Sequence, residues 1–332
     1  MRLGPIFRGV AGAALMAWAG MSAAASDFPS QPIRIIAGFP AGGFSDTMAR
    51  SVGNELGRRL KTPVIVENRP GANGTIGVRA LVNQAPNGYA IGLASTPFTI
   101  NPSIRNDLPY DSQKDVVPVA LMSLAPNLLV VNPRLGVNSV EELVKLARQK
   151  PGVLNFASVG VGSSPHLSSE MLVSAAKIEA THVPYNGSGP ALLDLIEGRV
   201  DFMFVNLPSA LPHVESGKLK ALAVAGEARS DVLPKVPTMI EAGIPDFVSV
   251  GWYGVIAPAG VPKDIVARYN TEINQILALP ELQTLLKEQG ATASRMSAEE
   301  FAEFLRADAV RWAKAVKDSG MKVEGGEAKA SK

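Results

Sequence analysis

The 332-residue chain contains no cysteine. This absence excludes a disulfide framework, a thiol nucleophile, thiolate metal ligands and a lipid attached to an N-terminal cysteine. It is compatible with export, because an exported protein of this size can fold on the burial of its core alone. Aromatic residues are also scarce, at 6% of the chain, which suits an α/β protein packed mainly by alanine, valine and leucine.

Charge of neither sign is in excess. The chain has 32 lysine and arginine residues against 30 aspartate and glutamate residues, and without Arg2 and Arg8 the two counts are equal. No charge run stands out, and the basic stripe of a nucleic-acid-binding protein is missing. We therefore expect no nucleic-acid partner.

Long apolar runs are missing except near the start of the chain. Residues 9–21, "GVAGAALMAWAGM", follow Arg2 and Arg8 and precede the small residues "SAAAS". This pattern predicts a secretory signal peptide over residues 1–25, whose cleavage releases the protein into the periplasm; a retained N-terminal anchor is the alternative. No later segment approaches the roughly eighteen apolar residues of a membrane span.

Short apolar runs alternate with helical patterns along the rest of the chain, whose length of about 300 residues favours two domains. The predicted strands have the sequences "IRIIAGF", "PVIVEN", "YAIGLAS", "NLLVVNP", "LNFASVG", "ATHVPYNG", "VDFMFVN" and "LKALAVAG". Met48, Val52, Leu56 and Leu60 recur every four residues after the first strand and predict a helix there. Such alternation is typical of parallel sheets covered by helices on both faces.

The last part of the chain has helical patterns without strands of its own. We expect these helices to pack back onto the first sheet, so that the chain crosses between two lobes twice, near residues 120–130 and 245–257. The predicted fold class is α/β, a two-lobe clam shell in which each lobe is a mainly parallel sheet flanked by helices and two crossing strands form the hinge. The predicted parts are lobe 1 (26–125 and 253–325), lobe 2 (126–252) and a disordered polar tail (326–332).

The stretch "GFPAGGFSD" (38–46) joins the first strand to the first helix. Ligands of open α/β sheets lie beyond the carboxyl ends of the strands, where a helix N-terminus favours an anion. Gly42 and Gly43 would let the backbone approach such a ligand, while Ser45 would cap the helix and offer a hydroxyl. Ser163 and Ser164 would do the same in the other lobe, with Ser164 as the predicted N-cap.

The anion could be a phosphate, a catalytic oxyanion or a carboxylate. "GFPAGG" lacks the Lys-Ser/Thr of a P-loop and the glycine spacing of a dinucleotide site, and "GVGSSP" is not a nucleophile elbow. His166, His182 and His213 have no metal-ligand spacing. The sequence thus predicts a binding protein with no metal, no cofactor and no enzymatic activity, and a carboxylate as its ligand. Ordinary turn chemistry is the alternative for any one of these loops.

Five further residues have either two possible roles or a structural one. Asp46 either stabilises the start of its helix or accepts a hydrogen bond from a ligand amine or a bridging water. His166 either faces the cleft or packs inside the lobe, whereas His182 lies in an apolar strand and is predicted to be structural. Trp252 and its neighbour Tyr253 are predicted to pack at the hinge.

Several segments carry a family resemblance, in the order in which they occur. They are "FPSQPIRIIAGFPAGGFSD", "VIVENRPGANGTIG", "APNGYAIGLAS", "LNFASVGVGSSPHL", "THVPYNGSGPALLDLIEGRVDFMFVNLPSALPHVESGKLKALAV" and "GWYGVIAPAGVP". From about Phe28 to about Val323 the chain resembles the Bug-type (TctC-like) extracytoplasmic solute-binding proteins of tripartite tricarboxylate transporters. It departs mildly at Phe44, where proline is common in the family, and at Ser45, where threonine is also common.

The resemblance implies a periplasmic-binding-protein-like (type II) clam shell without a cofactor. Such a monomeric receptor closes on a small carboxylate-bearing metabolite and delivers it to the permease subunits of the transporter. The implied substrate-binding residues are Gly42, Gly43, Ser45, Asp46, Ser163 and Ser164 around one carboxylate, with Phe39, Ser95, Thr96, His166 and Asn206 lining the cleft. A periplasmic ligand-sensing subunit that uses the same cleft is the alternative function.

Overall fold

A computed structural model describes residues 28–319. The predicted signal peptide (1–25) and most of the C-terminal segment, including the predicted tail (326–332), lie outside the described residues. Within residues 28–319, no helix combines the length and the apolar character that crossing a membrane requires.

The first lobe is built on three parallel strands with β1 in the middle. They are β1 (Ile33–Ala37), β2 (Val64–Asn68) and β3 (Ala90–Ser95). Each is followed by a helix, namely α1 (Phe44–Leu60), α2 (Thr75–Val82) after the short turn η1 (Ala72–Gly74), and α3 (Pro97–Ile104). All four predicted apolar positions of α1 are buried, which confirms the helical pattern.

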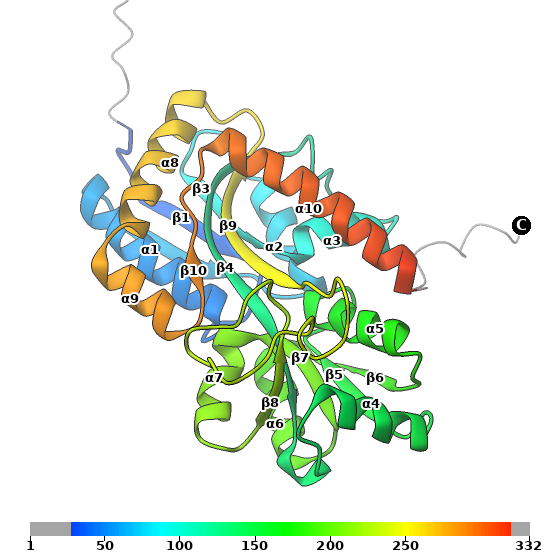
Figure 1. The fold of residues 1–332 in the computed structure, drawn as a ribbon. Coiled ribbons are helices and arrows are strands. Elements are labelled where there is room, and N and C mark those ends of the chain that lie inside the picture. The colour runs from blue at the N-terminus through cyan, green and yellow to red at the C-terminus, as the bar shows by residue number, and fades with distance from the viewer. Residues whose placement is uncertain (1–27, 320–332) are drawn as a thin grey trace, which may run out of the picture.

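The second lobe repeats this plan below the first in Figure 1. Its parallel strands are β5 (Asn155–Ser158), β6 (Thr181–Pro184) and β7 (Phe202–Asn206), with β5 in the middle. Its helices are α4 (Val140–Gln149), α5 (Ser164–Ala176), α6 (Ser188–Glu197) and α7 (Leu207–Glu215), and a short turn, η2 (Pro133–Leu135), precedes α4.

Two long antiparallel strands, β4 (Val116–Val131) and β9 (Val250–Pro258), join the lobes (Figure 1). The first part of β4 pairs with β9 and with β10 (Thr292–Ala293), and its last residues pair with β7 and with β8 (Lys220–Val224). β9 also pairs with β3 of the first lobe. The predicted crossings therefore are strands, and the lobe limits at residues 125/126 and 252/253 stay a prediction.

The three C-terminal helices pack on the first lobe, as predicted. They are α8 (Lys263–Leu277), α9 (Pro280–Glu288) and α10 (Ala298–Ser319). Tyr269 and Ile273 of α8 lie in the same core as α1 and β1, and Phe301 of α10 packs with Trp252 of β9.

The end of α10 also reaches the second lobe, where it lies beside α5 (Figure 1). Trp312 and Val316 of α10 form a buried cluster with Leu167 of α5 and with Ile100 and Ile104 of α3. The two lobes thus share a small apolar core on this side of the molecule.

The segments 95–99 ("STPFT") and 206–212 ("NLPSALP"), which contain the predicted cleft residues Ser95, Thr96 and Asn206, are largely helical. They form the beginnings of α3 and α7, each with a proline in its first turn and another inside. A proline in the first turn does not remove a helical hydrogen bond, and helices this short depend on tertiary burial rather than on intrinsic propensity.

Candidate functional site

The N-terminus of α1 lies at the carboxyl end of β1 and has no side-chain cap. Gly43 is its N-cap residue, so the prediction that Ser45 caps the helix is wrong, and Ser45 lies in the first turn instead. The first intrahelical bond is donated by the Thr47 N–H to the Gly43 carbonyl. The N–H groups of residues 43–46 have no hydrogen-bond partner among the described residues. They add to the partial positive charge at the end of a 17-residue helix.

Gly42 shapes this loop and does not offer its own N–H group. Its φ of +85° lies in the left-handed region that favours glycine. Its N–H donates to Asp46 Oδ2 at 3.0 Å, so this donor is already used inside the protein.

Asp46 is buried and fully hydrogen-bonded. Its Oδ2 also accepts from Arg50 Nε at 2.9 Å, and its Oδ1 accepts from Asn68 Nδ2 at 3.0 Å. Burial by itself would raise the pKa of Asp46, but the hydrogen bonds from Arg50, Gly42 and Asn68 outweigh it and keep that pKa below its ordinary value. Of the two predicted roles, the geometry thus favours the structural one: a charged carboxylate that fixes the loop.

The N-terminus of α5 faces the same region from the second lobe. Its N-cap is Ser163, whose hydroxyl accepts from the His166 N–H at 3.3 Å, so the prediction of Ser164 as N-cap is wrong by one residue. The Ser163 N–H bonds to the Gly160 carbonyl and the Gly162 N–H to the His166 ring. Pro165 has no N–H. Among the backbone N–H groups of residues 162–166, that of Ser164 is the one without a partner in the described part of the chain.

Three hydroxyl groups near these helix ends also have no partner within residues 28–319. They belong to Ser45 of α1, Ser95 at the end of β3 and Ser164 of α5, and each of these residues is at least nine-tenths buried. None of the three is among the buried side-chain atoms that lack a partner, so each hydroxyl is accessible and can bond to a ligand or to water.

The loops of the two lobes approach each other closely. A Cβ atom added to Gly187, after β6, would lie 3.8 Å from Pro40 Cγ in the loop after β1. A Cβ added to Gly162 would lie 3.6 Å from Asn73 Nδ2 and would overlap Ile104 Cδ1. The loop after β1 thus meets the loop after β6, and the loop before α5 meets Asn73, whose neighbour Gly74 contacts Phe39 of the loop after β1.

Thr96 and Asn206, predicted to line the cleft, lie at the hinge end of this region. Thr96 Oγ1 accepts from the Trp252 N–H at 2.9 Å, and Asn206 Nδ2 donates to Asn127 Oδ1 at 3.0 Å. Both approach Gly251 of β9, where an added Cβ would lie 2.6 Å from Asn206 Nδ2 and 3.6 Å from Thr96 Oγ1. Trp252 itself is fully buried, in line with its predicted packing at the hinge.

Phe39 lies against Gly74, beside a small cavity under the first lobe's loops. The cavity has a volume of about 10 Å³, which admits one water molecule. Its wall includes Asn73 and Tyr110, whose Oδ1 and hydroxyl are buried without a hydrogen-bond partner in the described residues.

His166 is buried inside the second lobe. Its ring contacts Gly162, Glu170 and the ring of His182, and only 5% of its surface is exposed. Both ring nitrogens of His166 thus face partners inside the lobe, whereas the N–H and the hydroxyl of Ser164 have none among the described residues. His182 packs against Phe156, as its apolar strand predicted.

Several residues that support the site could not be identified from the sequence. Arg50 follows Asp46 by one helical turn, a spacing that could have revealed the pair. Asn68 gave no such signal, since it is 22 residues from Asp46. Asn127 likewise gave none: its buried amide donates to Ser168 and Ser249, residues far apart in the chain.

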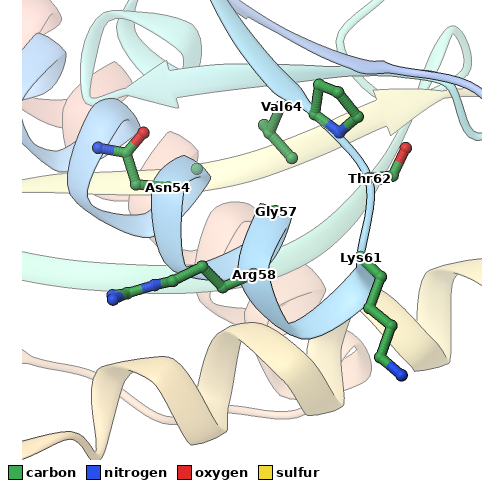
Figure 2. A pocket seen from close by; sticks show the side chains of 8 residues that line it. Asn54, Gly57, Arg58, Lys61, Thr62 and Val64 are labelled. Atoms are coloured by element: carbon green, nitrogen blue, oxygen red, sulfur yellow. The ribbon is translucent and has the colours of Figure 1, made fainter.

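An open hollow lies elsewhere, between the last turns of α1 and the start of β2 (Figure 2). It is an open basin of about 400 Å³ over Gly53 and Gly57, with Arg58 and Lys61 at its rim. It faces the C-terminal end of α1, whose dipole disfavours an anion. We therefore do not assign the carboxylate to this basin. Among residues 28–319, no three histidine, aspartate or glutamate side chains cluster in a way that could bind a metal.

Residues 48–321 match the family described as "Tripartite tricarboxylate transporter family receptor". Protein BugT of Bordetella pertussis is 36% identical over 313 residues, which are 93% of this chain and 96% of BugT. The "UPF0065 protein in tcbD-tcbE intergenic region" of Pseudomonas sp. (strain P51) is 37% identical over 290 residues, 87% of this chain and 86% of that protein.

Three solved structures have the same architecture. The R. palustris protein Rpa4515 with adipate has a TM-score of 0.86 at 32% identity, and covers 89% of this chain and 99% of its own. The periplasmic binding protein BugD has a TM-score of 0.84 at 31% identity with the same coverage. MatC from Rhodopseudomonas palustris with bound malate has a TM-score of 0.82 at 32% identity, and covers 87% and 100%. These similarities confirm the predicted two-lobe fold.

Proposed function

Because the chain belongs to the tripartite tricarboxylate transporter receptor family, as its Bug-type resemblance predicted, we propose that it is an extracytoplasmic receptor for a small carboxylate. The ligand binds between the lobes and is delivered to the membrane permease subunits of such a transporter. The receptor acts in the periplasm as a monomer. The family and its solved relatives are binding proteins, which supports binding rather than catalysis.

The unpartnered donors at the two helix ends carry this proposal. The start of α1 offers the N–H groups of residues 43–46, and the start of α5 offers that of Ser164. A carboxylate accepts several hydrogen bonds, and bonds from neutral donors to a charged acceptor are stronger than neutral ones. The nearest arginine of α1, Arg50, is already paired with Asp46, so dipoles and hydroxyls rather than a free cation bind the anion.

The predicted residues then divide into two groups. Gly43, Ser45 and Ser164 bond the carboxylate, whereas Gly42, Asp46 and Ser163 fix the loops that present these donors. Phe39, Ser95, Thr96 and Asn206 surround the rest of the ligand, whereas His166 contacts Gly162 inside the second lobe and supports the loop before α5. Rotation about β4 and β9 closes the lobes, and the ligand favours the closed state because both helix ends contact it only there.

The relatives narrow the ligand class. Rpa4515 was solved with adipate and MatC with malate, which are both dicarboxylates. A small dicarboxylate is therefore the first class to test, since one carboxylate would contact the helix ends and the other the remainder of the cleft.

A thermal-unfolding panel tests the proposal. The protein is unfolded and refolded to remove bound ligand, and its melting temperature is measured with di- and tricarboxylates, aromatic carboxylates, acidic amino acids and the matching amides. A ligand at about one hundred times its dissociation constant contributes roughly 2.7 kcal/mol, which should raise the melting temperature by about 5 °C. We expect a shift with one carboxylate and none with its amide; a shift with a neutral solute alone would contradict the proposal.

Two serines of α5 give a matched pair of variants. Ser164→Ala removes a hydroxyl at the cleft, and we expect about tenfold weaker carboxylate binding by titration calorimetry. Ser174→Ala removes an exposed hydroxyl near the other end of the same helix and should leave binding unchanged. Equal affinities of the two variants would place the carboxylate away from α5.

A further inference from the structure

Two histidines of the second lobe stack on each other beneath the loop that leads into α5. The rings of His166 and His182 are 3.8 Å apart between centroids and tilted by 15°. Phe156 of β5 packs on His182 at 5.0 Å. The stack is at least half buried, although no metal is implied and sequence analysis gave His182 only a packing role.

The hydrogen bonds of His166 define which of its nitrogens carries a proton. The Gly162 N–H donates to His166 Nδ1 at 3.1 Å, so Nδ1 accepts and bears no proton. The proton therefore lies on Nε2, which faces Glu170 Oε1 at 3.4 Å. In this geometry the ring is neutral.

His182 bonds to the other end of the same loop. Its Nε2 lies 2.7 Å from Ser158 Oγ, which in turn lies 3.2 Å from both the N–H and the carbonyl of Gly160. Ser163 Oγ donates to the Gly160 carbonyl at 2.7 Å. Residues 158–163 are thus bonded at both ends to the two stacked imidazoles.

We propose that His166 is a positioning residue, which fixes residues 158–163 in their binding conformation only while its ring is neutral, so that carboxylate affinity falls when the ring takes up a second proton. This inference rests on the proposed function, because the loop that His166 fixes leads into α5 and presents Ser164 to the ligand.

A second proton has only one position available on the ring. It would lie on Nδ1, directly opposite the Gly162 N–H, and two donors would then face each other. Gly162 has little room to turn away, since its φ is +75° and its Cα faces Ile104 of the first lobe at contact distance. Protonation would thus disturb both the loop and its contact with the opposite lobe.

Two titratable side chains, those of Glu170 and His182, contact the His166 ring. Glu170, on the same helix, favours the charged ring. His182 remains neutral, because burial and the adjacent His166 lower the pKa of His182 to about 3. Phe156, the other ring packed on the stack, carries no charge.

NMR of the ligand-free protein tests the positioning role without any ligand. We expect the His166 ring to show a proton on Nε2 and none on Nδ1 at pH 8, and the Gly162 amide signal to move together with the His166 ring between pH 8 and pH 5.5. A Gly162 amide that does not respond while the His166 ring titrates would overturn the inference.

Binding of malate and adipate, measured by calorimetry from pH 8 to pH 5.5, tests the functional consequence. For the wild type we expect affinity to fall roughly fivefold or more, because only the neutral fraction of the protein is competent to bind. In His166→Asn the side-chain oxygen replaces Nδ1 as an acceptor that cannot be protonated, so affinity at pH 8 should be retained and its pH dependence largely lost. His213→Asn, which changes the remaining histidine outside the stack, should behave as the wild type.

The NMR and calorimetry experiments together distinguish a failure of this inference from a failure of the proposed function. If the Gly162 amide follows the His166 ring but neither these acids nor any other carboxylate of the panel binds, the positioning role stands and the proposed function fails. If a carboxylate binds with the same pH profile in the wild type and in His166→Asn, the proposed function stands and this inference fails.

Discussion

At the scale of single residues, the proposed site consists of hydrogen-bond donors without a protein partner and of side chains that fix the loops carrying these donors. Asp46 shows the difference, because its carboxylate could have been a ligand contact but instead accepts from Gly42, Arg50 and Asn68. A negative charge beside an anion site is tolerable only when it is neutralised, and Arg50 does so.

Replacing Asp46 by asparagine should loosen the loop after β1. Arg50 loses its ionic partner and the amide cannot accept all three bonds, so the free energy of unfolding should fall by about 1–3 kcal/mol and carboxylate affinity with it. The loss should shrink as the pH falls below about 4, because the unfolded chain then takes up a proton at Asp46, and it should vanish only below the lower pKa of the folded state. Urea unfolding at pH 7 and pH 3.5 measures both effects. Asp264→Asn, at an exposed position of α8, is the control, and an equal loss in both variants would refute the role of Asp46.

His182 should make stability depend on pH. The unfolded chain binds a proton at this histidine below about pH 6.5, whereas in the folded state burial and His166 lower the pKa of His182 to about 3. The unfolded state thus binds more protons between these values, and the free energy of unfolding should fall on acidification by up to about 1.4 kcal/mol per pH unit, less for a partly exposed ring.

Urea unfolding at pH 7.5 and pH 5 checks this dependence. His182→Phe retains the stacked ring and should show a smaller loss of stability between the two pH values than the wild type. His213→Phe is the control and should retain the wild-type loss. An unchanged loss in His182→Phe would show that His182 is not the group responsible.

At the scale of elements, the alternation of short apolar runs and helical patterns predicted most of the strands and helices. The helix predicted from Met48, Val52 and Leu56 coincides with α1, because the periodicity of apolar residues is a local property of the sequence. The caps of α1 and α5 were misassigned because two or more polar or glycine residues are adjacent there and only the backbone geometry distinguishes them. The helices α3 and α7 were missed because their stability comes from tertiary burial.

Helix α10 is fixed by one buried carboxylate. Asp308 Oδ2 accepts from Thr99 Oγ1 at 2.6 Å and from Trp252 Nε1 at 2.8 Å, which joins α10 to α3 and to the crossing strand β9. Arg311 is its ionic partner. No sequence pattern could reveal this junction, since Asp308 and Thr99 are 209 residues apart.

Removal of this carboxylate should therefore destabilise the protein strongly. We expect Asp308→Ala to lower the free energy of unfolding by about 3–5 kcal/mol, because Trp252 Nε1 and the Thr99 hydroxyl lose their buried acceptor. Asp318→Ala, which breaks the exposed pair with Lys314 on the same helix, should have little effect in the same urea titration. Similar losses in the two variants would contradict the assignment.

At the scale of the whole molecule, two lobes meet along the predicted cleft. The two-lobe fold followed from the alternation of strands and helices, and two crossings followed from C-terminal helices that lack strands. The contacts between the lobes could not be predicted from the sequence. Pro40 approaches Gly187, and Ile104 approaches Gly162, but no sequence pattern links the members of either pair. The loops of the proposed site could be chosen from the sequence because they follow strands, whereas the unpartnered donors within them depend on the folded backbone.

Gly162 offers a test of lobe contact. In Gly162→Ala the new Cβ would overlap Ile104 Cδ1 of the other lobe, so we expect a more open molecule with a larger radius of gyration by X-ray scattering and much weaker carboxylate binding. Gly217→Ala is a matched control, because its φ of +70° imposes similar backbone strain but nothing lies within 4 Å of the added Cβ. Equal scattering and binding in the two variants would show that this contact does not control closure.

The most direct test of the central claim is a crystal structure of the protein with the carboxylate that raises its melting temperature most. We expect one carboxylate of the ligand between the N-termini of α1 and α5. Its oxygens should lie within hydrogen-bond distance of N–H groups or hydroxyls of residues 43–45 and of Ser164. A ligand bound in another part of the molecule, or with a neutral group between these helix ends, would contradict it.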